Sequence, residues 1–161
     1  MNRTDKKVLY IDLDNTLVDF PSGIAALSDE DRDAYLDRYD EVPGIFALMQ
    51  PMDGALHAFH TLSAVFDTYI LSTAPWLNPS AWQHKLEWVY AHLGKDDTSP
   101  AHKRLILSHH KNLNRGHFLV DDRPNNGAEE FGRMPGQEWI QFGCGDHAEW
   151  SKVTEYLLAR A

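Results

Sequence analysis

Residues 10–17 read Tyr-Ile-Asp-Leu-Asp-Asn-Thr-Leu, an apolar, strand-like run that leads into two aspartates. Residues two apart on an extended backbone point the same way, so Asp12 and Asp14 face one space. Two carboxylates held that close repel each other. A divalent cation removes the repulsion, and Mg²⁺ prefers oxygen ligands of this kind. The stretch therefore predicts a metal-assisted active site at the end of a buried strand.

A second acid pair repeats this design far downstream. Residues 116–124 read Gly-His-Phe-Leu-Val-Asp-Asp-Arg-Pro, an apolar strand followed by Asp121, Asp122 and a breaker. An isolated Asp-x-Asp is usually a turn with solvated carboxylates. Two separate strands that both end in acid pairs are hard to explain in that way. The repetition favours one shared site over two unrelated turns.

The composition is that of an ordinary globular domain. The chain has 161 residues, of which 43% are hydrophobic and 24% charged, enough for one sizeable core. Its net charge of −9 argues against binding a nucleic-acid polymer or an anionic membrane. The single cysteine, Cys144, allows no intrachain disulfide, and the polar N-terminus contains no apolar signal segment. We expect a cytoplasmic protein.

Short apolar runs alternate with longer helical patterns, which predicts an α/β fold. We expect a Rossmann-like three-layer sandwich around a mainly parallel, five-stranded sheet. The predicted strands cover residues 7–12, 68–72, 104–108, 117–121 and 138–142, and the main helices cover residues 52–65, 80–93 and 146–159. In the second of these helices, the spacing predicts a buried stripe of Trp82, Leu86, Val89 and Leu93.

Residues 21–50 interrupt the alternation. They include a helix start at Ser28 followed by three acids, a polar helix through Arg38, and an apolar patch after the Pro43-Gly44 break. An insertion after the first strand of an α/β sheet lies over the carboxyl ends of the strands, where such folds bind ligands. We therefore expect a small helical cap, residues 21–50, within a single hydrolase domain, residues 1–161.

Polar residues follow four of the predicted strand regions, and together they suit phosphoryl transfer. This reaction depends on in-line positioning and on neutralising charge on the phosphoryl oxygens. Asp12 would attack phosphorus, and Asp14 would protonate the leaving oxygen and then activate water. Mg²⁺ would be held by Asp12, Asp121 and the backbone carbonyl of Asp14. Lys111 would hold the phosphate, with Thr73 and its neighbouring amides after the second strand.

These residues resemble the motifs of the haloacid-dehalogenase-like phosphohydrolase superfamily. Asp12-Leu13-Asp14-Asn15-Thr16 is similar to its first motif, and Thr73, Lys111 and Asp121-Asp122 to the other three. Within that group the chain looks most like the 5′(3′)-deoxyribonucleotidase family. The added marks are Asp19-Phe20, Pro51-Met52-Asp53-Gly54-Ala55, Ser72-Thr73-Ala74-Pro75 and Asp121-Asp122-Arg123-Pro124. The chain departs from that family at Asn15, where Gly is usual, and at Trp76, where a smaller or aliphatic residue is usual.

The resemblance implies further roles. Ala74 and a second lysine, Lys85, would contact the phosphate, Asp122 would support the metal ligands from behind, and Phe20 would lie against a nucleotide base. The implied activity is that of a Mg²⁺-dependent 5′-nucleotidase that acts on (deoxy)nucleoside monophosphates through an aspartyl-phosphate.

Two alternatives remain open. The same chemistry would serve a phosphatase for a sugar phosphate or another small phosphometabolite, because cap residues set specificity. A protein of another class, a catalytically silent binding protein, would keep the fold and lose an essential residue. A homodimer surface that includes Trp76, Trp82 and Trp88 is a further possibility, although core packing explains these residues equally well.

Overall fold

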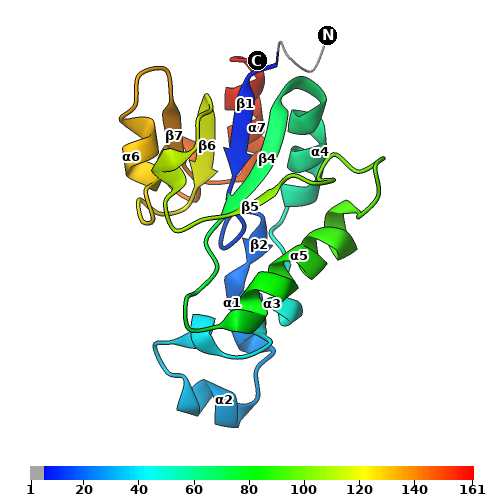
Figure 1. Cartoon of the computed structure of the whole chain (residues 1–161), viewed down its shortest axis with the longest axis vertical. Coiled ribbons are helices and arrows are strands. Elements are labelled where there is room, and N and C mark those ends of the chain that lie inside the picture. Colours follow the sequence, from blue (N-terminus) through cyan, green and yellow to red (C-terminus); the bar gives the residue numbers. More distant parts are fainter. Residues whose placement is uncertain (1–5) are drawn as a thin grey trace.

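The computed structural model describes residues 6–161, and a parallel five-stranded sheet forms its centre (Figure 1). The strand order is β5-β4-β1-β6-β7, and every neighbouring pair runs parallel. The strands are β1 (Val8–Ile11), β4 (Asp67–Ser72), β5 (Leu105–Leu107), β6 (Phe118–Asp121) and β7 (Glu138–Gln141). Each lies within one residue of its predicted limits, so the predicted fold class is confirmed.

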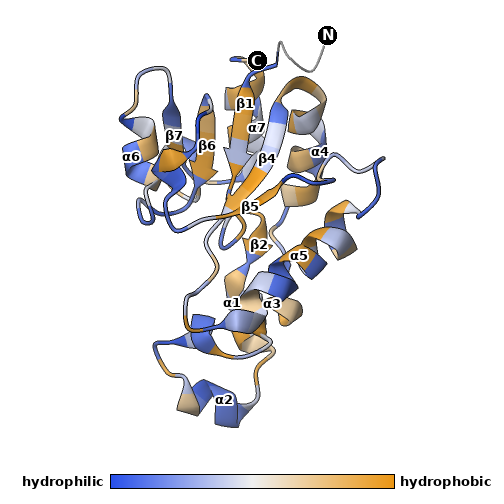
Figure 2. Cartoon of the chain, viewed as in Figure 1, coloured by the Kyte–Doolittle hydropathy of each residue, from blue (hydrophilic) through white to orange (hydrophobic). Residues whose placement is uncertain are grey.

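Helices cover both faces of the sheet because successive side chains of the buried strands point to opposite faces. Leu9 and Ile11 of β1 pack into the larger core with α4 (Ala55–Val65) and α7 (Trp150–Leu158). Tyr10 lies on the other face, in a smaller cluster with Phe131 of α6 (Ala128–Gly132). Apolar residues accordingly dominate the central strands, and polar residues dominate the surrounding loops (Figure 2).

The two acid pairs meet because β1 and β6 are neighbours. Ile11 pairs with Val120, and the amide of Asp12 donates to the Val120 carbonyl at 2.9 Å. The strands are parallel and in this register, so Asp12 and Asp121 lie side by side at the carboxyl ends of β1 and β6. Two short 3-10 helices complete the main body: η3 (Lys111–Leu113) follows β5, and η4 (Gly145–His147) precedes α7.

The residues inserted after β1 form a separate lobe below the sheet (Figure 1). Its two ends pair as an antiparallel ribbon of β2 (Val18–Asp19) and β3 (Gln50–Pro51). Between them lie α1 (Phe20–Ala25), α2 (Asp29–Ala34), η2 (Tyr39–Glu41) and α3 (Ile45–Leu48). The polar helix is shorter than predicted: it ends at Ala34, and Asp37 adopts a left-handed backbone with φ of 64°.

The helix α5 (Pro79–Leu93) joins this lobe to the sheet. The side-chain amide of Asn78 donates to the carbonyls of Asp40 and Val42, at 2.9 Å each, and the indole of Trp88 donates to the Met49 carbonyl at 3.1 Å. The buried stripe of α5 differs from the predicted one. Its buried residues are Ala81, Lys85, Trp88, Val89 and Leu93, whereas Trp82 and Leu86 are exposed.

No helix within residues 6–161 is both long enough and apolar enough to span a bilayer.

Candidate active site

A buried lysine lies between two aspartates at the carboxyl end of β1 and β6. Lys111, the first residue of η3, is only 3% exposed. Its Nζ lies 3.0 Å from Asp12 Oδ1 and donates a hydrogen bond to the carboxylate of Asp121. Both aspartates are buried as well. The sequence-predicted nucleophile, metal ligand and fixed cation are therefore brought together by the fold.

The electrostatics of this cluster reflect two buried carboxylates that share one cation. Burial raises the pKa of Asp121 to about 7, and the neighbouring Asp12 adds to the shift, while Lys111 opposes it. Burial alone would lower the pKa of Lys111, but the carboxylates of Asp12 and Asp121 outweigh it and the pKa is raised. Lys111 therefore stays charged, and the acid pair has a surplus of negative charge.

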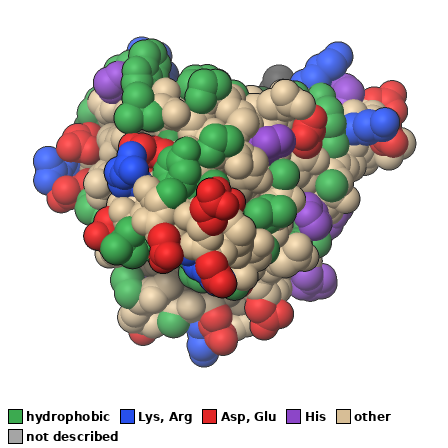
Figure 3. All heavy atoms as spheres, turned by 90° about the horizontal axis from the view of Figure 1, so that it is seen from below, with side chains coloured by type: hydrophobic (Ala, Val, Ile, Leu, Met, Phe, Trp, Pro, Cys, Tyr) green, Lys and Arg blue, Asp and Glu red, His purple; other side chains and the backbone are tan. Residues whose placement is uncertain are grey.

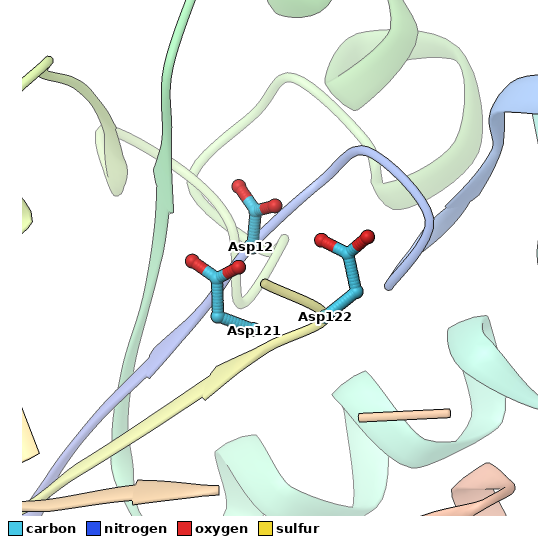
Figure 4. Close-up of side chains that lie close together, drawn as sticks. All are labelled: Asp12, Asp121 and Asp122. Carbon is cyan, nitrogen blue, oxygen red and sulfur yellow. The ribbon is translucent and has the colours of Figure 1, made fainter. Parts of the chain in front are cut away.

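Three aspartates form a set of oxygens suited to a metal ion. Oxygens of Asp12, Asp121 and Asp122 lie within 4.8 Å of one another, and their carboxylates converge at the strand ends (Figure 4). Asp122 Oδ1 is buried and has no hydrogen-bond partner within residues 6–161, and the buried Asp12 Oδ1 shares the ammonium of Lys111 with Asp121. Burying anionic oxygens that are unpaired, or that share one cation, is costly, so these atoms fit a hard cation such as Mg²⁺. Asp122 thus joins the candidate ligands directly, a role that the sequence interpretation had placed behind them.

Asp14 lines the same cavity but is not part of this oxygen set, and its carboxylate pairs with a second lysine, Lys85. Its Oδ2 accepts a hydrogen bond from Lys85 Nζ at 2.7 Å, and Oδ1 is buried with no partner within residues 6–161. Burial raises the pKa of Asp14; the charge of Lys85 counteracts the shift, and that of Asp12 adds to it. A carboxyl group with a raised pKa at the edge of the site is suited to carry a proton. The following residue, Asn15, adopts a left-handed backbone with φ of 54°, which Asn tolerates better than most residues.

The residues predicted to bind phosphate lie in different environments. Thr73 lines the site cavity, and its hydroxyl donates to the Ser108 carbonyl at 2.8 Å. Ala74 is fully buried, so only its backbone is available for a phosphate contact. Lys111 lines the cavity next to Asp12. Lys85 is 2% exposed and bonds to Asp14, Ser72 and the Thr73 carbonyl.

A cavity of about 530 Å³ opens onto these groups. Phe20, predicted as a pocket residue, lines it from the lobe, together with Asp37, Tyr39 and Asp40. The cavity walls also include His109, Arg123, Asn125 and Asn126, none of which was a predicted site residue. His109 stands next to Lys111 in sequence and Arg123 follows the second acid pair, and nearness to a motif was the only available signal for them.

An exposed tryptophan lies at the cavity mouth. Trp76, which follows Thr73-Ala74-Pro75, is 80% exposed, and its ring meets that of His109 edge-on at 5.8 Å. Trp82 of α5 contacts the same histidine at 6.2 Å. Trp88, the third tryptophan considered for a dimer surface, is buried under the lobe and belongs to the core.

This combination of a β5-β4-β1-β6-β7 parallel sheet, an insertion after β1, and acids and a lysine at the strand ends defines a haloacid-dehalogenase-like hydrolase. Two solved structures share the fold. The HAD-hydrolase YfnB from Bacillus subtilis, described as bound to magnesium, superimposes with a TM-score of 0.60 at 12% identity, covering 86% of this chain and 87% of that one. The haloacid dehalogenase-like protein SP0104 from Streptococcus pneumoniae superimposes with a TM-score of 0.51 at 16% identity, covering 95% of this chain and 91% of that one.

Sequence comparisons identify the family. A family model described as 5′ nucleotidase, deoxy (Pyrimidine), cytosolic type C protein matches residues 22–152. A Vibrio phage KVP40 protein assigned as a 5′(3′)-deoxyribonucleotidase is 56% identical over 157 residues, covering 98% of this chain and 88% of that protein. The human cytosolic type 5′(3′)-deoxyribonucleotidase is 34% identical over 110 residues, covering 65% of this chain and 50% of that protein. The chain belongs to the 5′ nucleotidase, deoxy (pyrimidine), cytosolic type C family, a family of phosphatases.

Proposed function

We propose that the protein is a Mg²⁺-dependent phosphatase that hydrolyses (deoxy)nucleoside monophosphates through an aspartyl-phosphate on Asp12. The observation that carries the proposal is the placement of Asp12 beside Lys111 and Asp121, at the inner end of a cavity that Asp14 also lines. A nucleophile, a fixed cation and a second carboxyl group thus face one substrate-sized space.

The reaction proceeds in two displacements. A carboxylate oxygen of Asp12 attacks phosphorus, and the bond from phosphorus to the nucleoside oxygen breaks. Asp14 gives its proton to that leaving oxygen, so the nucleoside departs as an alcohol. Asp14 then takes a proton from water, whose oxygen attacks phosphorus and releases inorganic phosphate. Asp12 regains its carboxylate, and Lys111 balances phosphoryl charge throughout.

The metal fits the residues present. Asp12, Asp121 and Asp122 would hold Mg²⁺, and the bound ion would neutralise charge on the phosphoryl oxygens. The contribution of the Asp14 backbone carbonyl stays a prediction from the sequence. Lys111 alone cannot balance the carboxylates of Asp12 and Asp121 together with a phosphate dianion, and this imbalance supports a requirement for a divalent cation.

The cavity supports a nucleotide as the substrate. Its walls include the aromatic residues Phe20, Tyr39 and Trp76, and flat apolar rings suit a nucleobase. The phage relative, assigned as a 5′(3′)-deoxyribonucleotidase, aligns over nearly the whole chain and supports the same substrate class. The human relative is named as a cytosolic type, which agrees with the cytoplasmic location expected from the sequence.

The test is phosphate release from a panel of 5′- and 3′-(deoxy)nucleoside monophosphates, sugar phosphates and p-nitrophenyl phosphate, with Mg²⁺ or with EDTA. We expect Mg²⁺-dependent turnover with deoxynucleotides preferred, and loss of turnover in Asp12→Asn. A preference for sugar phosphates would keep the mechanism and overturn the substrate assignment. Full activity in EDTA, or in Asp12→Asn, would overturn the mechanism itself.

A further inference from the structure

We propose that Lys85 is a positioning residue: it holds the carboxyl group of Asp14 in place for proton transfer to the leaving oxygen, and it does not contact the phosphate. This inference rests on the proposed function, because it assigns a task to Lys85 within that reaction. It replaces the phosphate contact that the sequence resemblance implied for this residue.

The hydrogen bonds of Lys85 are fully used inside the protein. An ammonium group has three N–H donors. Those of Lys85 go to Asp14 Oδ2 at 2.7 Å, Ser72 Oγ at 2.9 Å and the Thr73 carbonyl at 2.8 Å. A phosphate contact would require breaking one of these bonds in a buried environment, where an unpaired polar group is costly.

The position of Lys85 is equally unsuited to substrate contact. Its side chain is 2% exposed, and it is not among the residues of the described chain that line the site cavity. Asp14 does line that cavity, and Lys85 approaches it from the side of α5. The order is therefore cavity, Asp14, Lys85. In contrast, Lys111 lines the cavity directly and is the cation placed to meet a phosphate.

The lobe completes the enclosure of Lys85. The ring of Phe46 in α3 lies 4.7 Å from Lys85 Nζ, and a cation over an aromatic face is attracted to it. Trp88, one turn further along α5, is anchored to the Met49 carbonyl. Lys85 is thus fixed at once by the end of β4, the turn after β1 and the lobe, so the position of the Asp14 side chain depends on how the lobe packs.

If Lys85 positions Asp14, removing Lys85 should lower kcat/KM by an amount that depends on the leaving group. Without its partner, Asp14 is free to rotate, and proton delivery to the nucleoside oxygen fails. General acid catalysis contributes roughly 10²–10⁴-fold to reactions whose leaving group needs a proton. The p-nitrophenolate ion departs without one. The quantity to compare is kcat/KM, because it reports the steps through formation of the aspartyl-phosphate and excludes the later attack by water.

The experiment measures kcat/KM of Lys85→Met and Lys85→Arg for a deoxynucleoside monophosphate and for p-nitrophenyl phosphate. We expect the nucleotide value of Lys85→Met to fall about 100-fold and the aryl phosphate value to change less than about threefold. Lys85→Arg keeps the charge but does not reproduce the three contacts of a compact ammonium group. We therefore expect kcat/KM for the nucleotide to fall selectively in this variant too, but by less than in Lys85→Met. If Lys85→Met fails to fold, this second variant decides. Equal losses on both substrates, with a raised KM, would overturn the proposal in favour of phosphate binding.

Arg104→Met provides a matched control. Arg104 is also a buried cation, paired with Asp67 at 2.7 Å, but at the opposite ends of the strands. Its loss should lower stability and leave the ratio of the two kcat/KM values unchanged. A changed ratio in this control would show that the ratio reports general destabilisation, and would overturn the assignment. Failure of the wild type to hydrolyse either substrate, or activity of Asp12→Asn, would instead count against the proposed function.

Discussion

At the residue scale, Lys111 is the cation on which the acid cluster depends. It separates Asp12 and Asp121, which would otherwise face each other uncompensated inside the protein. Removing one partner of a buried ion pair costs about 3–5 kcal/mol, because the remaining charge stays buried. We expect Lys111→Met to lower the free energy of unfolding of the metal-free protein by roughly 3 kcal/mol, measured by urea denaturation in EDTA.

The same variant should raise KM and lower kcat together, since the phosphate is held in both the ground and transition states. Lys152→Met is the control: Lys152 is exposed on α7, and its removal should leave stability and kinetics nearly unchanged. Unaltered unfolding of Lys111→Met in EDTA would contradict the role of Lys111 in balancing the acid cluster.

The residues around the acid pair differ in how far the sequence could predict them. Asp12 and Asp121 were predictable as neighbours because acids at the carboxyl ends of adjacent parallel strands lie at the same end of the sheet. The contact between Lys85 and Asp14 was not, because it joins residues 71 positions apart through the packing of α5. A lysine within a helix normally indicates a solvated face, and only the arrangement of three acceptors around it reverses that expectation.

At the element scale, α5 shows why helical spacing alone does not identify the buried face of a helix. The predicted face of Trp82, Leu86, Val89 and Leu93 has a correct helical period, but so does the neighbouring face of Ala81, Lys85 and Trp88. The lobe and the sheet pack against this neighbouring face, so Lys85 is buried while Trp82 and Leu86 stay exposed. The five strands were predicted accurately because short, continuous apolar runs bounded by polar residues are typical of strands buried on both faces of a parallel sheet.

The lobe offers a second prediction, at the contact between α1 and α3. A Cβ added at Gly23 would lie 2.7 Å from Met49 Cγ and 3.3 Å from the Ile45 carbonyl oxygen. A larger side chain there must push the elements of the lobe apart. We expect Gly23→Val to lower the Tm by several degrees and to raise KM for nucleotides more than for p-nitrophenyl phosphate, because the lobe lines the outer cavity.

The control is Ala25→Val, which adds a β-branched residue at an exposed position of the same helix. It should change the Tm and both KM values little. If Gly23→Val shifted the two KM values equally, the lobe would not distinguish between substrates, and its predicted role as a specificity-setting cap would be contradicted.

At the scale of the whole molecule, the charge distribution opposes an anionic substrate. The net charge is −9, and the first turn of α2 carries Asp29, Glu30 and Asp31. The end of the molecule formed by the lobe shows more acidic than basic side chains (Figure 3). A phosphate reaching the cavity therefore relies on local positive charge, from Lys111 and from a bound cation, to overcome this field.

The acid cluster consequently links the stability of the whole chain to pH and to Mg²⁺. Burial raises the pKa of Asp121 from 3.8 to about 7, so in the metal-free protein the folded state binds a proton that the unfolded state releases near pH 4. This contribution to stability is complete below the unfolded pKa and is lost as pH rises through about 7. We expect the Tm in EDTA to fall between about pH 5 and pH 8, and to fall less in Asp121→Asn.

Mg²⁺ should reverse this loss, because it binds the deprotonated carboxylates of the folded state and competes with the proton. The rise in Tm on adding Mg²⁺ should therefore be larger at about pH 8 than at about pH 5, as measured by thermal unfolding at matched ionic strength. Asp122→Asn, which removes one candidate ligand, should reduce this rise at both pH values. A Mg²⁺ effect that is the same in Asp122→Asn and in the wild type would exclude Asp122 from the metal site. It would leave Asp12 and Asp121 as its carboxylate ligands.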